Sequence, residues 1–180
     1  MSTLKNISDQ VLWSSEYELI SDFYKDKRAK RSQVHYMNHI NEGLVVLGAL
    51  KSTIAAQKAY CLHPLLQDDS SVEDNIREVI DYTHEYVLFL TMEYRNVANR
   101  GLHCYQVADP SKIYLSPIKE VNDMLIADKV QNRKDFLIYH YGTHPKSKEL
   151  DQYFKNWLTA LGVSEDRYKE LVDLINRSVM

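Results

Sequence analysis

The residue types best suited to chemistry in this chain gather around Asp128. On a helix, Asp128, Asn132 and Asp135 stand at positions i, i+4 and i+7, so they share one face. Their neighbours are largely apolar, and a polar side chain buried there without a partner costs roughly 2–7 kcal/mol. A metal ion or a polar ligand would offset that cost. Far upstream, His39 and His63 lie in similarly apolar helical contexts and offer imidazole nitrogens, which are common metal ligands.

The composition indicates one globular domain. The chain has 180 residues, of which 44% are hydrophobic, enough for a single packed core. A net charge of −3 argues against a general nucleic-acid coat protein. Cys61 and Cys104 do not form a disulfide framework. Residues 1–10 are polar and no apolar run reaches membrane-spanning length, so we expect a cytoplasmic protein that contacts no membrane.

The apolar spacing favours helices throughout, and no segment shows a convincing strand pattern. Only five glycines and four prolines interrupt the chain, which favours long regular elements. The fold class expected is therefore all-α, a compact single-domain bundle with a core at about 8–162 and a C-terminal helix at about 164–178. The helices are expected at about 8–28, 34–50, 53–66, 72–98, 117–141, 147–161 and 164–177.

Three motifs along the chain occur in a familiar order. Residues 36–39 read Tyr-Met-Asn-His, residues 59–68 read Ala-Tyr-Cys-Leu-His-Pro-Leu-Leu-Gln-Asp, and residues 127–135 read Ala-Asp-Lys-Val-Gln-Asn-Arg-Lys-Asp. In these motifs the chain resembles the HD-domain superfamily, and within it the guanosine-polyphosphate hydrolases of the RelA/SpoT and small metazoan SpoT-like type. The resemblance spans roughly residues 20–160 and implies an HD-like helical bundle.

The resemblance also implies a metal centre. Its family binds a divalent ion, usually manganese, and His39, His63 and Asp128 match the ligands. Two neutral imidazoles and one carboxylate suit Mn²⁺, and also Fe²⁺ or Zn²⁺. Asn132 matches a residue that lines the nucleotide pocket.

Two positions depart from the family pattern. Pro64 stands where the aspartate of the HD doublet is expected, which removes one ligand. Gln67 and Asp68 stand at the acidic pair that positions the attacking water, so Gln67 replaces a glutamate and Asp68 is left as the candidate base. The loss of a carboxylate weakens divalent binding, and a site without metal is one of the outcomes expected.

Cationic and amide side chains elsewhere are candidates for binding a substrate. Lys30 and Arg31, at the end of a basic run, match positions where the family contacts phosphate and base. Arg95 and Asn99 lie at i and i+4 and can face the same cleft. The alternative for each is a solvated surface residue.

Three functions remain open from the sequence. The first is a metal-dependent phosphohydrolase of a nucleotide or a guanosine-polyphosphate-like ester. The second is an inactive protein of the same fold that binds or sequesters a nucleotide or a partner protein, and the third is an interaction role, with a homo-oligomer among the partners. His39 can also be a core histidine bonded to a carbonyl, and Asp128 can pair with Lys129 as a structural ion pair. The compactness of the chain further suggests a phage or mobile-element source.

Overall fold

The computed structural model describes residues 7–30, 32–102 and 109–178, and these residues form helices and connecting turns. The expected all-α single-domain bundle is confirmed. The helices are α1 (Asp9–Leu12), α2 (Ser15–Tyr24), α3 (Tyr36–Ala49), α4 (Ile54–Leu66), α5 (Val72–Val79), α6 (Glu85–Leu102), the short 3-10 helix η1 (Pro110–Lys112), α7 (Lys119–Tyr139), α8 (Ser147–Ala160) and α9 (Glu165–Ser178).

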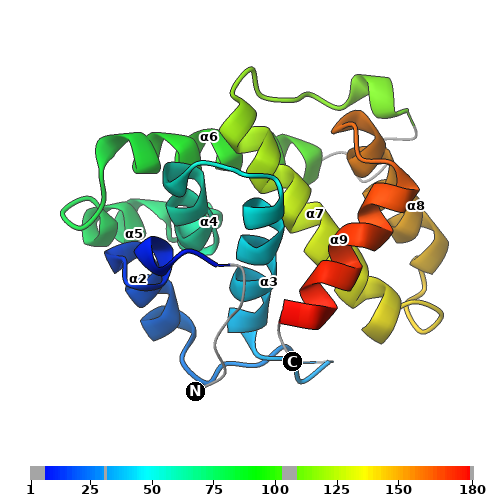
Figure 1. Cartoon of the computed structure of the whole chain (residues 1–180), viewed down its shortest axis with the longest axis horizontal. Coiled ribbons are helices and arrows are strands. Elements are labelled where there is room, and N and C mark those ends of the chain that lie inside the picture. Colours follow the sequence, from blue (N-terminus) through cyan, green and yellow to red (C-terminus); the bar gives the residue numbers. More distant parts are fainter. Residues whose placement is uncertain (1–6, 31, 103–108, 179–180) are drawn as a thin grey trace.

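The helices α3, α4 and α7 form the centre of the bundle. In Figure 1, α2 and α5 lie on one side of them and α8 and α9 on the other, while α6 runs alongside α4. The C-terminal helix α9 packs against α3 and α7, so it belongs to the same core. No helix in the described part of the chain combines the length and apolar character needed to cross a membrane.

Two helices expected to be continuous are each divided in two. Within residues 8–28, the Ser14 hydroxyl accepts a hydrogen bond from the Tyr17 backbone N–H, so a new helix begins there. Within residues 72–98, α5 ends at Val79 and α6 begins at Glu85. The Thr83 hydroxyl donates to the buried Glu16 carboxylate at 2.8 Å, and this tertiary contact holds the break between α5 and α6.

The central helix α7 has an unusual composition for its position. Its buried residues include Asp123, Asp128, Lys129, Arg133 and Lys134, in addition to apolar core residues. Charged groups are rarely buried without partners, because desolvation costs several kcal/mol per ion. The polar contacts of α7 are therefore the part of the fold that needs a functional or structural explanation.

Candidate metal centre

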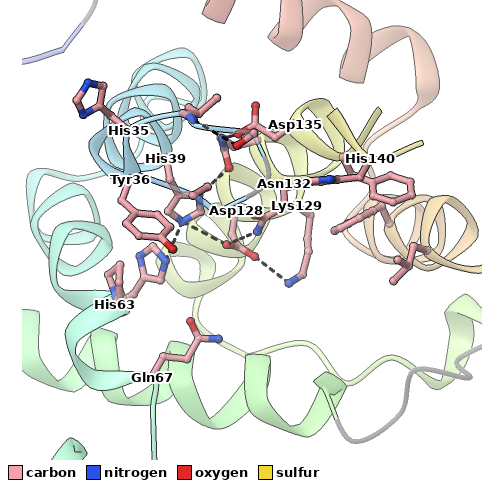
Figure 2. Close-up of a pocket in the computed structure, with 18 of the residues that line it drawn as sticks. His35, Tyr36, His39, His63, Gln67, Asp128, Lys129, Asn132, Asp135 and His140 are labelled. Carbon is pink, nitrogen blue, oxygen red and sulfur yellow. Dashed lines mark hydrogen bonds and ion pairs between the residues drawn. The ribbon is translucent and has the colours of Figure 1, made fainter. Parts of the chain in front are cut away.

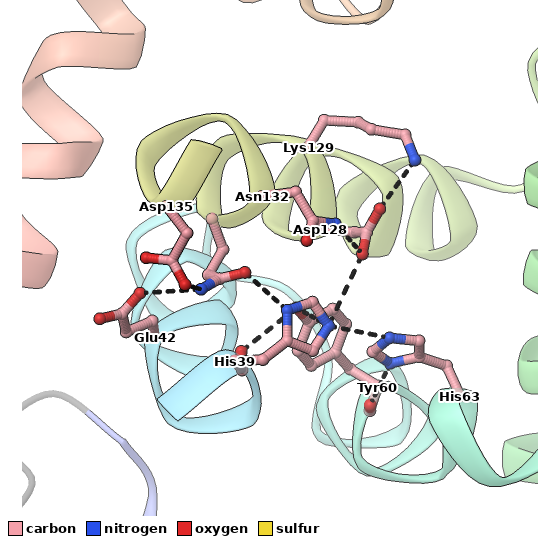
Figure 3. Close-up of polar contacts among 9 residues, drawn as sticks. His39, Glu42, Tyr60, His63, Asp128, Lys129, Asn132 and Asp135 are labelled. Atoms are coloured by element: carbon pink, nitrogen blue, oxygen red, sulfur yellow. Dashed lines mark hydrogen bonds and ion pairs between the residues drawn. The ribbon is translucent and has the colours of Figure 1, made fainter. Parts of the chain in front are cut away.

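His39, His63 and Asp128 come together in the middle of the bundle, as the sequence motifs predict. His39 lies in the first turn of α3, His63 in the last turn of α4 and Asp128 in the middle of α7. One ligand atom from each residue lies within 4.8 Å of the other two (Figure 3). The Nε2 atoms of the two histidines are 3.1 Å apart, and His39 Nε2 is 3.6 Å from Asp128 Oδ1. This group can hold a metal ion.

The hydrogen bonds of the two histidines determine which ring nitrogen carries the proton. His39 Nδ1 lies 2.6 Å from Gln131 Oε1, and His63 Nδ1 lies 2.6 Å from the Tyr60 carbonyl. A carbonyl oxygen only accepts, and the Gln131 amide nitrogen is already used to donate to two carboxylates. Both Nδ1 atoms are therefore the donors, and in the neutral rings both Nε2 atoms carry lone pairs.

In these tautomers the acceptor atoms of the three residues face one another, and the Tyr60 hydroxyl, 3.4 Å from His39 Nε2, can donate to one of them. Two imidazole lone pairs meet at 3.1 Å, and the Asp128 carboxylate lies beside them. A shared cation resolves this arrangement, and a hydrogen bond from Nδ1 to a fixed acceptor is the usual way in which proteins orient a metal-binding histidine. Burial and the neighbouring His39 lower the pKa of His63 to about 3, so its ring is neutral near pH 7.

Asp128 is held on both oxygens by residues of its own helix. Asn132 Nδ2 donates to Oδ1 at 2.8 Å, and Lys129 Nζ lies 2.8 Å from Oδ2. Burial opposes ionisation of this carboxyl, but Lys129 and the two histidines outweigh it and lower its pKa to about 2. The ion pair that the sequence left open is therefore present. It uses Oδ2, whereas Oδ1 is the oxygen nearest the histidines.

A second network supports the first from one turn further along α7. Gln131 Nε2 donates to Glu42 at 3.2 Å and to Asp135 at 2.8 Å. Lys134 Nζ lies 2.9 Å from oxygens of Glu42 and of Asp135. Gln131 is thereby fixed by two carboxylates on one end, and its oxygen is presented to His39 on the other.

The candidate metal centre opens into a pocket of about 540 Å³ (Figure 2). This volume is within the range of sites for small-molecule ligands. Gln67 and Asn132, both predicted from sequence, line it together with His39, His63 and Asp128. His35, which the sequence offers as a supporting or alternative ligand one turn before His39, also lines it. The lining further includes side chains that the sequence did not single out as site residues, namely Tyr24, Tyr36, Lys129, Phe136 and His140.

The predicted residues Asp68, which follows α4, and Arg95 and Asn99, which lie on α6, are not part of the pocket lining. Asp68 is exposed, and its carboxylate accepts from the backbone N–H and the hydroxyl of Ser70, both at 2.9 Å, which lowers the pKa of Asp68. Arg95 forms an ion pair with Asp69, and Asn99 Nδ2 donates to the Gln67 carbonyl at 3.1 Å. Through these contacts, Arg95 and Asn99 hold residues 67–69, which follow α4, against α6.

The predicted basic residues lie in the loop that joins α2 to α3. Lys30 is exposed, and its carbonyl accepts a hydrogen bond from the Gln33 amide. Ala29 and Ser32 of the same loop line the pocket. Arg31 lies outside the described residues, so the structure gives no position for it.

Sequence reasoning missed the residues that orient the ligands. Gln131 stands three positions after Asp128, Glu42 three after His39, and Tyr60 three before His63. On a helix this spacing puts each of them on the face of its ligand, so the signal was available in the spacing alone. What the spacing does not give is the pairing of Gln131 with His39, which joins residues 92 positions apart.

Comparison of the chain with protein-family models, with curated proteins and with solved structures found no match.

Proposed function

We propose that this protein is a metal-dependent phosphohydrolase of the HD type that acts on a nucleotide or a guanosine-polyphosphate-like phosphate ester. One observation carries the proposal. Three lone-pair-bearing atoms, on His39, His63 and Asp128, converge at a pocket wide enough for a small phosphorylated molecule. Manganese is the first ion to test, because the motif resemblance favours it and a donor set of two imidazoles and a carboxylate suits it.

The roles of the residues follow from their chemistry. When bound, the ion supplies a Lewis acid for a phosphate oxygen and an acidified water. Asn132 and Lys129 hold the Asp128 carboxylate in its ionised form and fixed in place. The aromatic rings of Tyr24, Tyr36 and Phe136 in the lining offer flat apolar surfaces against which a nucleobase can pack.

The proton of the attacking water needs an acceptor. Gln67 lies in the pocket lining, but its amide is neutral and serves only to orient a water or a phosphate oxygen. Asp68 is the candidate base of this proposal, and it must turn from Ser70 toward the pocket to act. Low turnover is therefore expected.

Pro64 and Gln67 favour a second candidate function. Both positions lack the carboxylates that the family pattern places there, and Pro64 lies in the pocket lining. A protein that retains the pocket without the base would bind a nucleotide and release no product. This alternative predicts tight binding that is independent of turnover.

The experiment is a measurement of product release from a panel of nucleotides that includes guanosine tetraphosphate, with Mn²⁺ and then with a chelator. We expect slow release that depends on Mn²⁺ and is abolished in His39→Ala and Asp128→Ala. His84→Ala is the matched control, because His84 is exposed and outside the pocket. Unchanged activity in either site variant would reject the assignment, and binding without release from any substrate would support the second candidate.

A further inference from the structure

An exposed apolar surface lies where α5 passes into α6. Ile80, Tyr82, Tyr86 and Phe89 are all exposed, and Tyr82 is 63% exposed. The rings of Tyr86 and Phe89 stack with their centroids 6.1 Å apart, and Ile80 and Phe89 line one hollow of about 420 Å³. Single exposed apolar side chains are common, but a group of neighbouring ones usually marks an interaction surface. Residues 78–89 are called the acidic aromatic face below.

The charges on this face are strongly one-sided. Residues 72–89 contain five acidic residues and one arginine, whereas the whole chain has a net charge of only −3. Glu78, Asp81 and Glu85 are exposed, and none of them has an ion-pair partner among the described residues. The face therefore suits a partner surface that combines positive charge with apolar area.

The chain itself carries such a surface in the turn that follows α2. Residues 25–30, called the basic turn, contain four cationic residues and one aspartate. Lys25 and Lys27 are exposed and, within the described part of the chain, form no ion pair. Lys27 Nζ lies 4.3 Å from the centroid of the exposed Phe23 ring. The basic turn thus presents positive charge next to an aromatic ring.

The two surfaces lie at the two ends of α2. The Thr83 hydroxyl donates to Glu16 in the first turn of α2, which holds the acidic aromatic face beside the start of this helix. The basic turn begins at Lys25, where α2 ends. The 10 residues of α2 span about 15 Å. Figure 1 shows α2 and α5 next to each other at one end of the molecule. A two-fold axis near α2 can therefore bring each surface of one copy against the other surface of a second copy.

We propose that this chain forms a two-fold dimer in which the acidic aromatic face of each copy binds the basic turn of the other. Two equal contacts close the assembly at two chains. The aromatic rings supply apolar area to bury, and the opposite charges favour encounter and fix the register. The inference is independent of the proposed function, because neither Lys25, Lys27 nor any residue of the face belongs to the pocket lining of the candidate metal centre.

The test is the molar mass of the full chain, measured by light scattering after size-exclusion chromatography over a range of protein concentrations. One chain has a mass of 21.1 kDa, and we expect a species of twice that mass that dissociates on dilution. Salt should weaken it, because the screening length falls from about 10 Å at 0.1 M to about 3 Å at 1 M. A wild-type chain that stays monomeric at every concentration would overturn the inference, and a basic segment of another protein would then be the occupant to seek.

Charge reversal separates this contact from other modes of association. Asp81→Lys with Glu85→Lys reverses the face, and Lys25→Glu with Lys27→Glu reverses the turn. Each variant alone should raise the dissociation constant of the dimer roughly tenfold or more, because like charges then meet at both contacts. An equimolar mixture of the two variants should form dimers again, since each reversed surface then meets its opposite charge.

Asp173→Lys is the matched control. Asp173 is exposed on α9, which lies on the other side of the central helices from α2 and α5, and this variant should dimerise like the wild type. All the changed residues are exposed, so each variant should remain helical by circular dichroism. A dimer that persists in both reversed variants, a mixture that stays monomeric, or a dimer lost in Asp173→Lys would each contradict the proposed contact.

Discussion

Two charged clusters lie about one turn apart on α7, and they differ in how their buried polar atoms are paired. In the network around Lys134, Glu42 accepts from Lys134 and Gln131, and Asp135 accepts from the same two residues. In the cluster around Asp128, two histidine nitrogens and a carboxylate oxygen face one another. The first cluster is complete within the protein, whereas the second has acceptors in excess of donors.

The difference separates a structural network from a candidate metal centre. A buried charge with all its partners present holds helices together, as Glu42 and Lys134 join α3 to α7. Lone pairs that converge in excess of the available donors are costly unless a cation occupies the space between them. Charge and burial alone do not tell which cluster is the candidate site, because both clusters are charged and buried. The balance of hydrogen-bond donors and acceptors distinguishes them.

The largest effect is expected from breaking the complete network. Lys134→Ala leaves the buried Glu42 carboxylate without its cation, and removal of one partner of a buried pair typically costs 3–5 kcal/mol, so we expect a loss of about that size. Chemical denaturation measures the change. The double variant Glu42→Met and Lys134→Met should lose much less, because neither charge is then left alone. Equal losses in the single and double variants would contradict this account.

The next effect comes from filling the incomplete cluster. A divalent ion that binds only the folded protein stabilises it by about 2.7 kcal/mol at one hundred times its dissociation constant. Thermal unfolding with and without Mn²⁺ or Zn²⁺ should show a rise in Tm for the wild-type chain. Asp128→Asn should abolish the rise, since the amide lacks the charge. No rise with any ion in the wild type would assign the cluster to packing alone.

A smaller effect tests the link between the two clusters. Gln131→Leu removes the acceptor that fixes the proton of His39 on Nδ1, and loss of such a partner typically weakens metal binding 10–100-fold, so we expect a change of about that size. Isothermal titration with Zn²⁺ gives the affinity. Gln152→Leu is the control, because its amide lies on the surface of α8. An unchanged affinity in Gln131→Leu would mean that the two clusters are independent.

The smallest effect is expected where the buried Arg133 of α7 pairs with the half-exposed Glu165 of α9. Hydrogen bonds from Arg133 outweigh partial burial and lower the pKa of Glu165 below its ordinary 4.5. The pair therefore stabilises the fold above that pH, and its contribution disappears as the pH falls through the lowered pKa. The Glu165 side chain is 50% exposed, so the gain stays below about 1 kcal/mol. Glu165→Gln should lower the Tm slightly at pH 7, and this difference from the wild type should disappear at pH values below the lowered pKa of Glu165.

The sequence predicted local structure well where neighbours along the chain decide it. The sequence offers Ser52 or Thr53 as the cap of α4, and in the structure the Thr53 hydroxyl accepts from the Ala56 backbone N–H. Asn132 donates to Asp128 one turn away, which agrees with the expectation that the i, i+4 spacing puts the two side chains on one face. The break between α5 and α6 was missed, because Thr83 is held by Glu16, which is 67 residues distant.

For the candidate site, the sequence by itself determined the candidate ligands, namely two histidines and an aspartate on apolar helix faces. Only the tertiary structure decided that these three meet, because the crossing of α3, α4 and α7 places His39 within 3.1 Å of His63. The structure also decided which nitrogen of each ring donates, since Gln131 and the Tyr60 carbonyl accept from the two Nδ1 atoms. Helical periodicity determines which residues share a face of one helix. Packing between helices determines which faces meet, and the chemistry of this site depends on that packing.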